Sequence, residues 1–314
     1  YTSICLGASI GIFAQFCFER LLQSTGRTKL AMYTQIAGAV INIILDPILI
    51  FGLFGFPRMG ILGAAVATVI GQIIAMLLLL YFNIRKNSDV NLNMRRFRPD
   101  TAIIAEIYRV GLPSIIMQSI SSVMTFGVNK ILLLFSETAV SVFGIYFKLQ
   151  SFIFMPVFGL NNAMVPIVAY NYGAARKDRI MKTIRSSVTA AVAIMLAGLA
   201  IFQIFPEQLL YLFDASEHMM GIGVPALRII SLSFLFAGYC IVIGSVFQAL
   251  GNGVYSLITS AARQLVCILP AAWLFASVFG LHAVWYAFPL AEIISVVLTT
   301  LLFRRIYRKK IQLL

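Results

Sequence analysis

The stretch "LAMYTQIAGAVINIILDPILIFGLF", residues 30–54, is mostly apolar and contains a single carboxylate, Asp46. A helix needs about 20 predominantly apolar residues to cross the hydrocarbon core of a bilayer, and this stretch is long enough. Apolar stretches of similar length recur along the 314 residues, of which 61% are hydrophobic and 11% charged. A soluble domain carries about 25% charged residues. The composition therefore predicts an all-α polytopic membrane protein.

Hydropathy along the chain predicts about nine transmembrane helices. They cover residues 3–23, 30–54, 60–83, 109–135, 139–170, 184–205, 224–249, 254–279 and 281–303. The segment 99–108 is expected to form a short interfacial helix that leads into the fourth span. Pro156 and Pro166 are expected to bend or break the fifth span, because proline removes a backbone donor.

Basic residues gather in alternate loops, and this asymmetry predicts the orientation. The crowded side holds Arg20, Arg27, Lys29, Arg85, Lys86, Arg95, Arg96, Arg98, Arg109, Arg176, Lys177, Arg179, Lys182, Arg185, Arg304, Arg305, Arg308, Lys309 and Lys310. The opposite loops hold only Arg58 and Arg228. By the positive-inside rule the crowded side, with the C-terminus, is cytoplasmic. The net charge of +13 then reflects topology and contact with anionic lipid rather than a nucleic-acid site.

Two segments suggest an internal repeat. "LLQSTGRTKL" (21–30) and "VFQALGNGVY" (246–255) both close an apolar span with Gln-x-x-Gly, and both fall on the predicted cytoplasmic side. Each continues into a span with an internal proline and then a span that opens at a glycine. Two copies in one orientation indicate a parallel repeat of about six spans. We therefore expect about twelve spans in a complete protein, with three preceding residue 1.

A polar stripe accompanies Asp46 on its predicted helix. Asn42 lies one turn before it and Gln35 about two turns earlier, so the three side chains share a face. Pro47 leaves the Ile43 carbonyl without its helical donor and adds an acceptor. Because an aspartate at a helix centre costs about 2.5–3.5 kcal/mol, this stripe favours a carboxylate that exchanges H⁺ or holds Na⁺. The alternative is that Asp46 caps a proline-kinked segment near the interface.

With these motifs the chain resembles the multidrug and toxic compound extrusion (MATE) transporters over essentially its full length. The segments "TGRTKLAM" (25–32) and "AVINIILDPILIFGL" (39–53) resemble the family's fourth and fifth helices. "GILGAAVATVIGQ" (60–72) resembles the sixth and "YRVGLPSIIMQS" (108–119) the seventh. "GLNNAMVPIVAYNYGAARKDRI" (159–180) resembles the end of the eighth, and "SLITSAARQLVCILPAAWLF" (256–275) the eleventh.

The resemblance implies two six-helix lobes that export organic cations against an H⁺ or Na⁺ gradient. Residues 1–98 would form the second half of the N-lobe with the inter-lobe loop, and residues 99–314 the C-lobe. It also implies that Asn42, Asp46 and Thr68 belong to the cation-coupling network. Thr68 has a second interpretation, since it lies in a ladder of small residues that usually marks close helix packing.

The C-lobe carries intramembrane charges that are candidates for a substrate cavity. Lys148 and Arg263 are cations within predicted spans, and Glu292 is the deep acid of this lobe. A structural pairing of Glu292 with Arg263 or Lys148 is as well supported as a binding role, because an unpaired charge there is costly. Further polar candidates for the cavity are Gln35, Gln118 and Asn129, with Asn161 and Asn162, whose alternative role is interhelical hydrogen bonding.

These observations predict a monomeric secondary antiporter of the inner cell membrane that exports amphipathic cations. The alternative within transport is a flippase for lipid-linked saccharides, which the cations Lys148 and Arg263 keep open. An intramembrane enzyme is the weaker alternative. The G-x-S-x-G match at residues 7–11 lies in an apolar helix rather than a strand–turn–helix, and no P-loop or H-E-x-x-H motif occurs. The cysteines Cys5, Cys17, Cys240 and Cys267 lie in apolar runs and are expected to be packing residues, so no cofactor or metal is expected beyond Na⁺ at Asp46.

Overall fold

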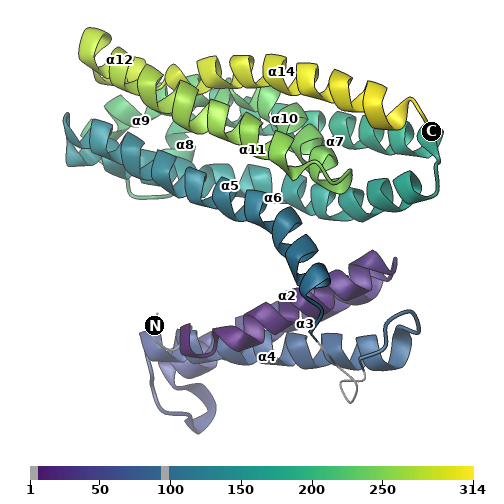
Figure 1. Cartoon of the computed structure of the whole chain (residues 1–314). Coiled ribbons are helices and arrows are strands. Elements are labelled where there is room, and N and C mark those ends of the chain that lie inside the picture. The colour runs from purple at the N-terminus through teal and green to yellow at the C-terminus, as the bar shows by residue number, and fades with distance from the viewer. Residues whose placement is uncertain (1–5, 93–98) are drawn as a thin grey trace. The chain divides into compact units, whose positions relative to one another are not determined.

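The computed structural model describes residues 6–92 and 99–314, and within them the chain is helical with short turns and no strand. The chain divides into two compact units, Tyr1–Pro99 and Asp100–Leu314, drawn from purple to blue and from blue to yellow in Figure 1. The first residues of the first predicted span, with Cys5, and the basic residues Arg95, Arg96 and Arg98 lie outside the described residues.

The described part of unit 1 consists of α2 (Ser9–Ser24), α3 (Thr28–Phe51), the 3-10 turn η1 (Leu53–Gly55) and α4 (Ile61–Lys86). Helix α4 packs along both α2 and α3 (Figure 1). The α3–α4 contact is close because glycines face each other: a Cβ added at Gly38 would lie 3.2 Å from the Gly71 carbonyl oxygen. Small residues at such crossings let helix backbones approach, which is how helices associate without a hydrophobic driving force in lipid.

Unit 2 is a bundle of long helices with short connecting pieces (Figure 1). Its elements are α5 (Thr101–Leu133), α6 (Glu137–Gly173), α7 (Lys177–Ile204), α8 (Pro206–Tyr211), α9 (Glu217–Ser231), α10 (Phe234–Ala249), α11 (Gly253–Ala261), the π-helix η3 (Ala262–Ile268), α12 (Leu269–Phe279), α13 (Leu281–Val284), α14 (Ala287–Ile306) and the π-helix η4 (Tyr307–Ile311). Helix α7 packs against α6 and α10, and α14 packs against α10 and η3.

Interlocked aromatic rings form the centre of unit 2. The ring centroids of Phe143 in α6 and Trp285 are 6.3 Å apart, and those of Phe202 in α7 and Phe234 in α10 are 5.2 Å apart. Tyr146 joins the two pairs, because its ring stacks on Phe143 and meets Phe202 edge-on. All five side chains are buried. Such ring pairs contribute about 0.5–1.5 kcal/mol each beyond the area they bury, and they fix the spacing of α6, α7 and α10.

The two Gln-x-x-Gly segments form the same helix-ending turn. Gly26 and Gly251 have φ of 77° and 72°, the left-handed conformation that glycine adopts without strain. The N–H of Arg27 donates to the Leu22 carbonyl at 2.8 Å, and the N–H of Asn252 donates to Phe247 at 2.8 Å. In both turns the glycine N–H also bonds three residues back, which completes a Schellman motif. The sequence similarity between the two segments therefore reflects an identical cap.

The structure contains seven helices that are long and apolar enough to cross a membrane, or eight if one bent pair counts as a single span, among the described residues. The prediction of an all-α polytopic membrane protein is confirmed. The remaining predicted span corresponds to α2, whose 16 described residues fall short of a full crossing.

Two predictions about helix breaks differ from the structure. The sequence predicts a short interfacial helix over residues 99–108 that leads into the fourth span, and in the structure residues 101–108 are the first turns of the single helix α5, which continues to Leu133. The fifth span is one helix of 37 residues that contains Pro156 and Pro166, so neither proline breaks it, and a bend at these prolines stays a prediction. Each proline removes one N–H donor, but the helix continues because the flanking turns and the neighbouring helices stabilise it.

The break occurs instead in the seventh predicted span, where α9 and α10 meet at a bend of 50°. At the bend the backbone N–H groups of Leu232 and Ser233 donate three residues back, and serine hydroxyls and a glutamine also donate to helical carbonyls. Ser231 Oγ donates to the Arg228 carbonyl at 3.0 Å, and Gln203 Nε2 of α7 donates to the same carbonyl at 2.7 Å. Ser233 Oγ donates to the Ile230 carbonyl at 2.6 Å. Side chains that take helical carbonyls bend the helix, so this kink needs no proline.

Candidate cation-coupling site

Asp46 lies near the end of α3, five residues before its last residue Phe51. The helix continues through Pro47 and stops at Gly52, whose φ of 75° places it in the left-handed region. A side chain at Gly52 would meet the backbone of Phe56, with a Cβ only 2.8 Å from its carbonyl oxygen. Asp46 is thus helical and half-buried rather than part of a turn. Because Pro47 has no N–H, the Ile43 carbonyl one turn earlier lacks its usual helical donor.

Asn42 and Asp46 contact each other as their spacing predicts. Asn42 Nδ2 donates to Asp46 Oδ1 at 3.4 Å, a long hydrogen bond between two half-buried side chains. The small residues of α4 bring a second helix to this place. A Cβ at Gly71 would lie 3.4 Å from Asn42 Cβ, and one at Gly63 would lie 2.5 Å from the Leu49 carbonyl oxygen. The Asn42–Asp46 pair therefore lies where α3 and α4 approach most closely.

Thr68 occupies α4 between these two glycines, at the height of Asp46 along the antiparallel pair. Its hydroxyl donates to the Ala64 carbonyl of its own helix at 2.9 Å, and no Thr68–Asp46 hydrogen bond occurs in the described part of the chain. The ladder that packs on α3 consists of the buried Gly63, Ala67 and Gly71. Thr68 is half-buried beside this ladder, so a role in coupling would require its hydroxyl to rotate toward Asp46.

In unit 2, Arg263 and Glu292 form an ion pair. Arg263 Nη1 lies 2.7 Å from Glu292 Oε1, and the two side chains are 25% and 9% exposed. Arg263 projects from the π-helical segment η3, which precedes Pro270. Lys148 is not the partner of Glu292: its Nζ lies 5.7 Å above the ring of Phe213, within cation–π range. The pairing of Glu292 with Arg263, one of two alternatives from the sequence, is what the structure contains.

The remaining polar candidates are spread over separate surfaces. Gln35 of α3 and Gln118 of α5 are exposed, and Asn129 of α5 is half-buried. Asn161 of α6 is buried with its Oδ1 atom unpartnered, whereas Asn162 is exposed. Gln35, Gln118, Asn129 and Asn161 make no hydrogen bond to either the Asn42–Asp46 pair or the Arg263–Glu292 pair in the described structure.

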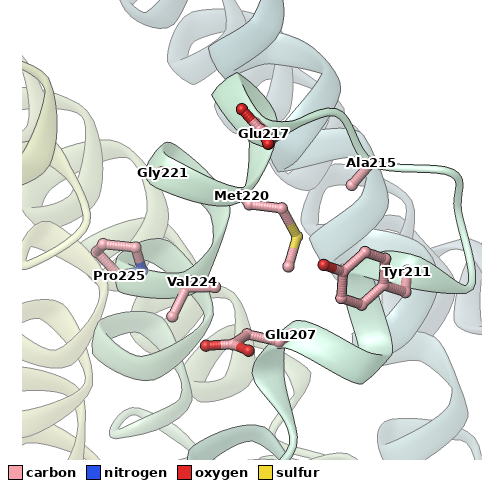
Figure 2. A pocket seen from close by; sticks show the side chains of 8 residues that line it. All are labelled: Glu207, Tyr211, Ala215, Glu217, Met220, Gly221, Val224 and Pro225. Atoms are coloured by element: carbon pink, nitrogen blue, oxygen red, sulfur yellow. The ribbon is translucent and has the colours of Figure 1, made fainter.

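A pocket of about 490 Å³ lies between α8 and α9 and contains none of the predicted site residues. Figure 2 shows Glu207 and Glu217 on opposite sides of it, with the Met220 side chain between them and Tyr211 at one wall. Both glutamates are exposed. Two acids, a thioether and an aromatic ring suit weak attraction of cations.

The sequence interpretation passed over Glu19. This residue of α2 is only 5% exposed, and its Oε2 atom has no hydrogen-bond partner in the described structure. The signal that could have found it is the spacing of Gln15, Glu19 and Gln23, four residues apart, which repeats a polar group on one helical face as Asn42 and Asp46 do.

The fold is that of a polytopic membrane protein with buried polar groups, and comparison with known proteins gives the family. The MatE family model matches residues 113–274, more than half of the chain. The chain belongs to the MatE family. The prediction of a MATE-type protein is thereby confirmed.

Individual relatives agree with this assignment. The multidrug export protein MepA of Staphylococcus haemolyticus is 29% identical over 277 residues, 88% of this chain and 60% of the relative. The probable multidrug resistance protein YoeA of Bacillus subtilis is 28% identical over 315 residues, 99% of this chain and 68% of the relative. The chain thus spans about 60% of the length of the staphylococcal relatives it matches.

Solved structures show the same fold. An outward-facing multidrug resistance MATE transporter of the MOP superfamily superimposes with a TM-score of 0.88 at 27% identity, over 97% of this chain and 68% of that one. A MOP superfamily transporter from Pyrococcus furiosus superimposes with a TM-score of 0.81 at 28% identity, over 89% and 63% of the two chains. That second protein is described as having a binding pocket of reversed polarity that suggests a different function.

Proposed function

We propose that the full-length protein is a secondary antiporter of the cell membrane that exports amphipathic organic cations in exchange for H⁺ or Na⁺. The observation that carries the proposal is the Asn42–Asp46 pair, a carboxylate with an amide 3.4 Å away inside an apolar helix of a MatE chain. The names of the relatives, multidrug export and multidrug resistance proteins, support the substrate class. No cofactor takes part, and the protein acts as a monomer in the bilayer.

The chemistry of the pair suits a monovalent ion. A carboxylate and an amide carbonyl offer oxygen ligands, the kind that hard cations prefer, and the unpaired Ile43 carbonyl adds a third. Ion binding neutralises the negative charge of Asp46. The half-buried carboxylate then attracts hydrogen-bond donors less strongly. A ligand drives a conformational change only by binding one state more tightly than the other, so uptake of the ion would favour the state in which these oxygens converge.

The basic ends of the helices support an orientation with the C-terminus in the cytoplasm. In that orientation Asp46, close to the end of α3 opposite to Lys29, lies in the outer half of the membrane. The ion would bind there from outside. Organic cations would be released to the same side.

The test uses the full-length protein in inside-out vesicles with a fluorescent organic cation, under an imposed H⁺ gradient and then an Na⁺ gradient. Uptake under one gradient identifies the coupling ion. Asp46→Asn is expected to abolish it while the protein still reaches the membrane. Asp214→Asn makes the same chemical change at an exposed loop residue and is expected to leave uptake unchanged. Normal uptake by Asp46→Asn would contradict the coupling role.

A flippase for lipid-linked saccharides is the second candidate, and the Pyrococcus transporter with its reversed pocket polarity is the observation that favours it. Such a cavity needs unneutralised cations to hold phosphates. Arg263 is paired with Glu292 at 2.7 Å, which leaves Lys148 as the exposed cation of the two. An absence of uptake by the wild type under both gradients would favour the flippase.

A further inference from the structure

Helix α2 carries a polar face that the proposed coupling site does not use. Gln15, Glu19 and Gln23 follow one another at four-residue spacing, and Gly11 precedes them on the same face. A Cβ at Gly11 would lie 3.4 Å from Ile73 of α4, so this face is turned toward α4. Glu19 is therefore buried between two helices of unit 1, at 5% exposure.

The carboxylate of Glu19 is only half satisfied. Gln23 Nε2 donates to Glu19 Oε1 at 2.7 Å, and Arg20 Nη1 in turn donates to Gln23 Oε1 at 2.8 Å. Glu19 Oε2 is buried and has no partner in the described structure, and the same holds for Gln15 Oε1 and Asn87 Oδ1. Each of these three atoms is an acceptor. Buried acceptors are almost always paired, so the missing group is a donor or a cation.

The amide of α4 that bonds to α2 is already committed. Asn83 Nδ2 donates both to the Phe18 carbonyl and to the Leu79 carbonyl, at 2.9 Å each. Asn87 Nδ2 donates to Asn83 Oδ1 at 3.1 Å. An asparagine amide has two N–H groups, and Asn83 therefore has none left for Glu19. These bonds tie α4 to α2 at the level of Glu19 and hold the unpaired oxygen in place.

Glu19 and Asp46 lie toward opposite ends of unit 1. Helix α2 ends at Ser24, and a turn at Thr25–Arg27 leads directly into α3, so Glu19 is about 7 Å from that shared end by helical rise. Asp46 is about 27 Å along α3 from the same end. The two carboxylates are thus separated by roughly 20 Å along the helix axes, too far to bind one ion together.

We propose that Glu19, with the side-chain carbonyl oxygen of Gln15, binds a monovalent cation, H⁺ or Na⁺, and is the site from which the coupling ion leaves toward the basic end of unit 1. This inference rests on the proposed antiport. One carboxylate and one amide oxygen match the charge of a monovalent ion. The Glu19–Gln23–Arg20 chain of hydrogen bonds connects the buried carboxylate to an exposed guanidinium.

The surrounding charges favour release rather than storage of a cation. Among the described residues, the charged groups at this end of unit 1 are Arg20, Arg27, Lys29, Arg85, Lys86 and Asp89. Arg27 lies 3.8 Å from Asp89, and the basic residues outnumber this acid, so the electrostatic potential at this end of unit 1 is positive. The uncharged titratable side chains of α2 and α4 are Cys17 and Tyr81, and both are exposed. A cation at Glu19 is therefore attracted by one carboxylate and repelled by its neighbourhood.

The test measures how the rate of organic-cation uptake depends on the H⁺ or Na⁺ concentration in the medium, which faces the basic side of the protein in inside-out vesicles. The full-length protein is placed in inside-out vesicles, the luminal ion is held constant, and the pH or Na⁺ concentration of the medium is varied. Wild-type uptake of a fluorescent organic cation is expected to slow as the ion in the medium rises. Glu19→Gln is expected to slow uptake about tenfold, the scale of one charged hydrogen-bonding interaction, and to lose the dependence on the medium.

Two variants serve as controls. Glu19→Asp keeps the carboxylate and is expected to keep the dependence. Glu106→Gln changes an exposed glutamate of α5 and is expected to behave as wild type. A purely structural Glu19 would instead lower the thermal unfolding temperature in Glu19→Gln and leave the dependence intact. That result would overturn the proposal. So would a Glu19→Gln variant whose uptake rate, and its dependence on the ion in the medium, equal those of the wild type.

Further measurements keep the outcome decisive. If Glu19→Gln does not accumulate, Gln23→Leu keeps the carboxylate but removes its Oε1 donor, together with the acceptor of Arg20 Nη1. This variant is expected to make uptake about threefold more sensitive to the ion in the medium. An unchanged sensitivity then overturns the proposal. If the wild type transports under neither gradient, the antiport itself fails. Glu19 is then judged by whether H⁺ or Na⁺ raises the unfolding temperature of the purified wild type but not of Glu19→Gln, and equal shifts in both count against the site.

Discussion

Arg263 and Glu292 join two helical segments of unit 2 through an ion pair of 2.7 Å between Nη1 and Oε1. The two partners differ in burial: the arginine side chain is 25% exposed and the glutamate side chain 9%. Arg263 lies in the π-helix η3, and its partner lies in α14, which packs against that segment. The second carboxylate oxygen of Glu292 is buried and has no hydrogen-bond partner among the described residues. The pair therefore holds a local irregularity of the backbone against a regular helix.

This difference in burial predicts an order of stabilities. Arg263→Met leaves a buried carboxylate without a counter-charge and is expected to lower the free energy of unfolding by about 3–5 kcal/mol. Glu292→Met leaves the more exposed guanidinium and is expected to cost less. The double variant removes both charges and is expected to be the most stable of the three. Unfolding of the full-length protein in detergent gives the order, and a double variant as unstable as Arg263→Met would show that the pair is a net stabiliser.

The matched caps of α2 and α10 predict matched effects of mutation. Gly26→Ala and Gly251→Ala both force a side chain into the left-handed region, at a cost of about 1–2 kcal/mol each. Asparagine at either position is expected to cost less, because its side chain tolerates this conformation. The midpoints of thermal unfolding in detergent measure both effects. Unequal losses at the two glycines would mean that neighbouring contacts, rather than the shared turn, determine the cost.

Hydropathy was sufficient to predict the helical spans because each apolar run is a local property of the sequence. The bend between α9 and α10 depends instead on Gln203 of α7, which donates to the Arg228 carbonyl across 25 positions of sequence. The π-helical segment before Pro270 likewise adds an irregularity that an apolar pattern does not record. Such long-range hydrogen bonds become visible only once the helices are packed.

In the candidate site, too, local contacts follow from the sequence, whereas long-range contacts require the fold. The contact between Asn42 and Asp46 follows from helical spacing alone and is present in the structure. The pairing of Arg263 with Glu292 rather than Lys148 required the fold, because 29 residues separate the partners. Glu19 escaped notice because a charge near the end of an apolar run is ordinarily interfacial, and only the packing of α4 makes it buried. The functional roles of Asp46, Asn42 and Thr68 remain predictions.

The hydrogen bond from Asn42 predicts a graded effect on coupling. At 3.4 Å it is long, so its loss in Asn42→Ala is expected to raise the ion concentration for half-maximal transport only a few-fold, against complete loss in Asp46→Asn. Val40→Ala, a change at an exposed position of the same helix, is expected to leave the value unchanged. Uptake measured against ion concentration in vesicles gives the comparison. A complete loss in Asn42→Ala would mean that the amide is itself an essential ligand.

The close approach of α3 and α4 predicts that the coupling pair is sensitive to a mutation that does not touch a polar group. A Cβ at Gly71 would lie 3.0 Å from the Gly38 carbonyl oxygen and 3.4 Å from Asn42 Cβ. Gly71→Ala is therefore expected to push the helices apart, cost about 1–3 kcal/mol of stability, and weaken ion coupling by displacing Asn42 from Asp46.

Gly144→Ala is the matched control for that change. It adds the same methyl group to an exposed helical glycine with nothing within 4 Å, and is expected to be neutral or to stabilise α6 by up to about 1 kcal/mol. Unfolding temperature and gradient-driven uptake are measured for both variants. If Gly71→Ala loses stability but keeps the wild-type dependence on the ion, the packing of α4 does not position Asn42. If it keeps both, the helices can separate without cost, and the close contact does not maintain the site.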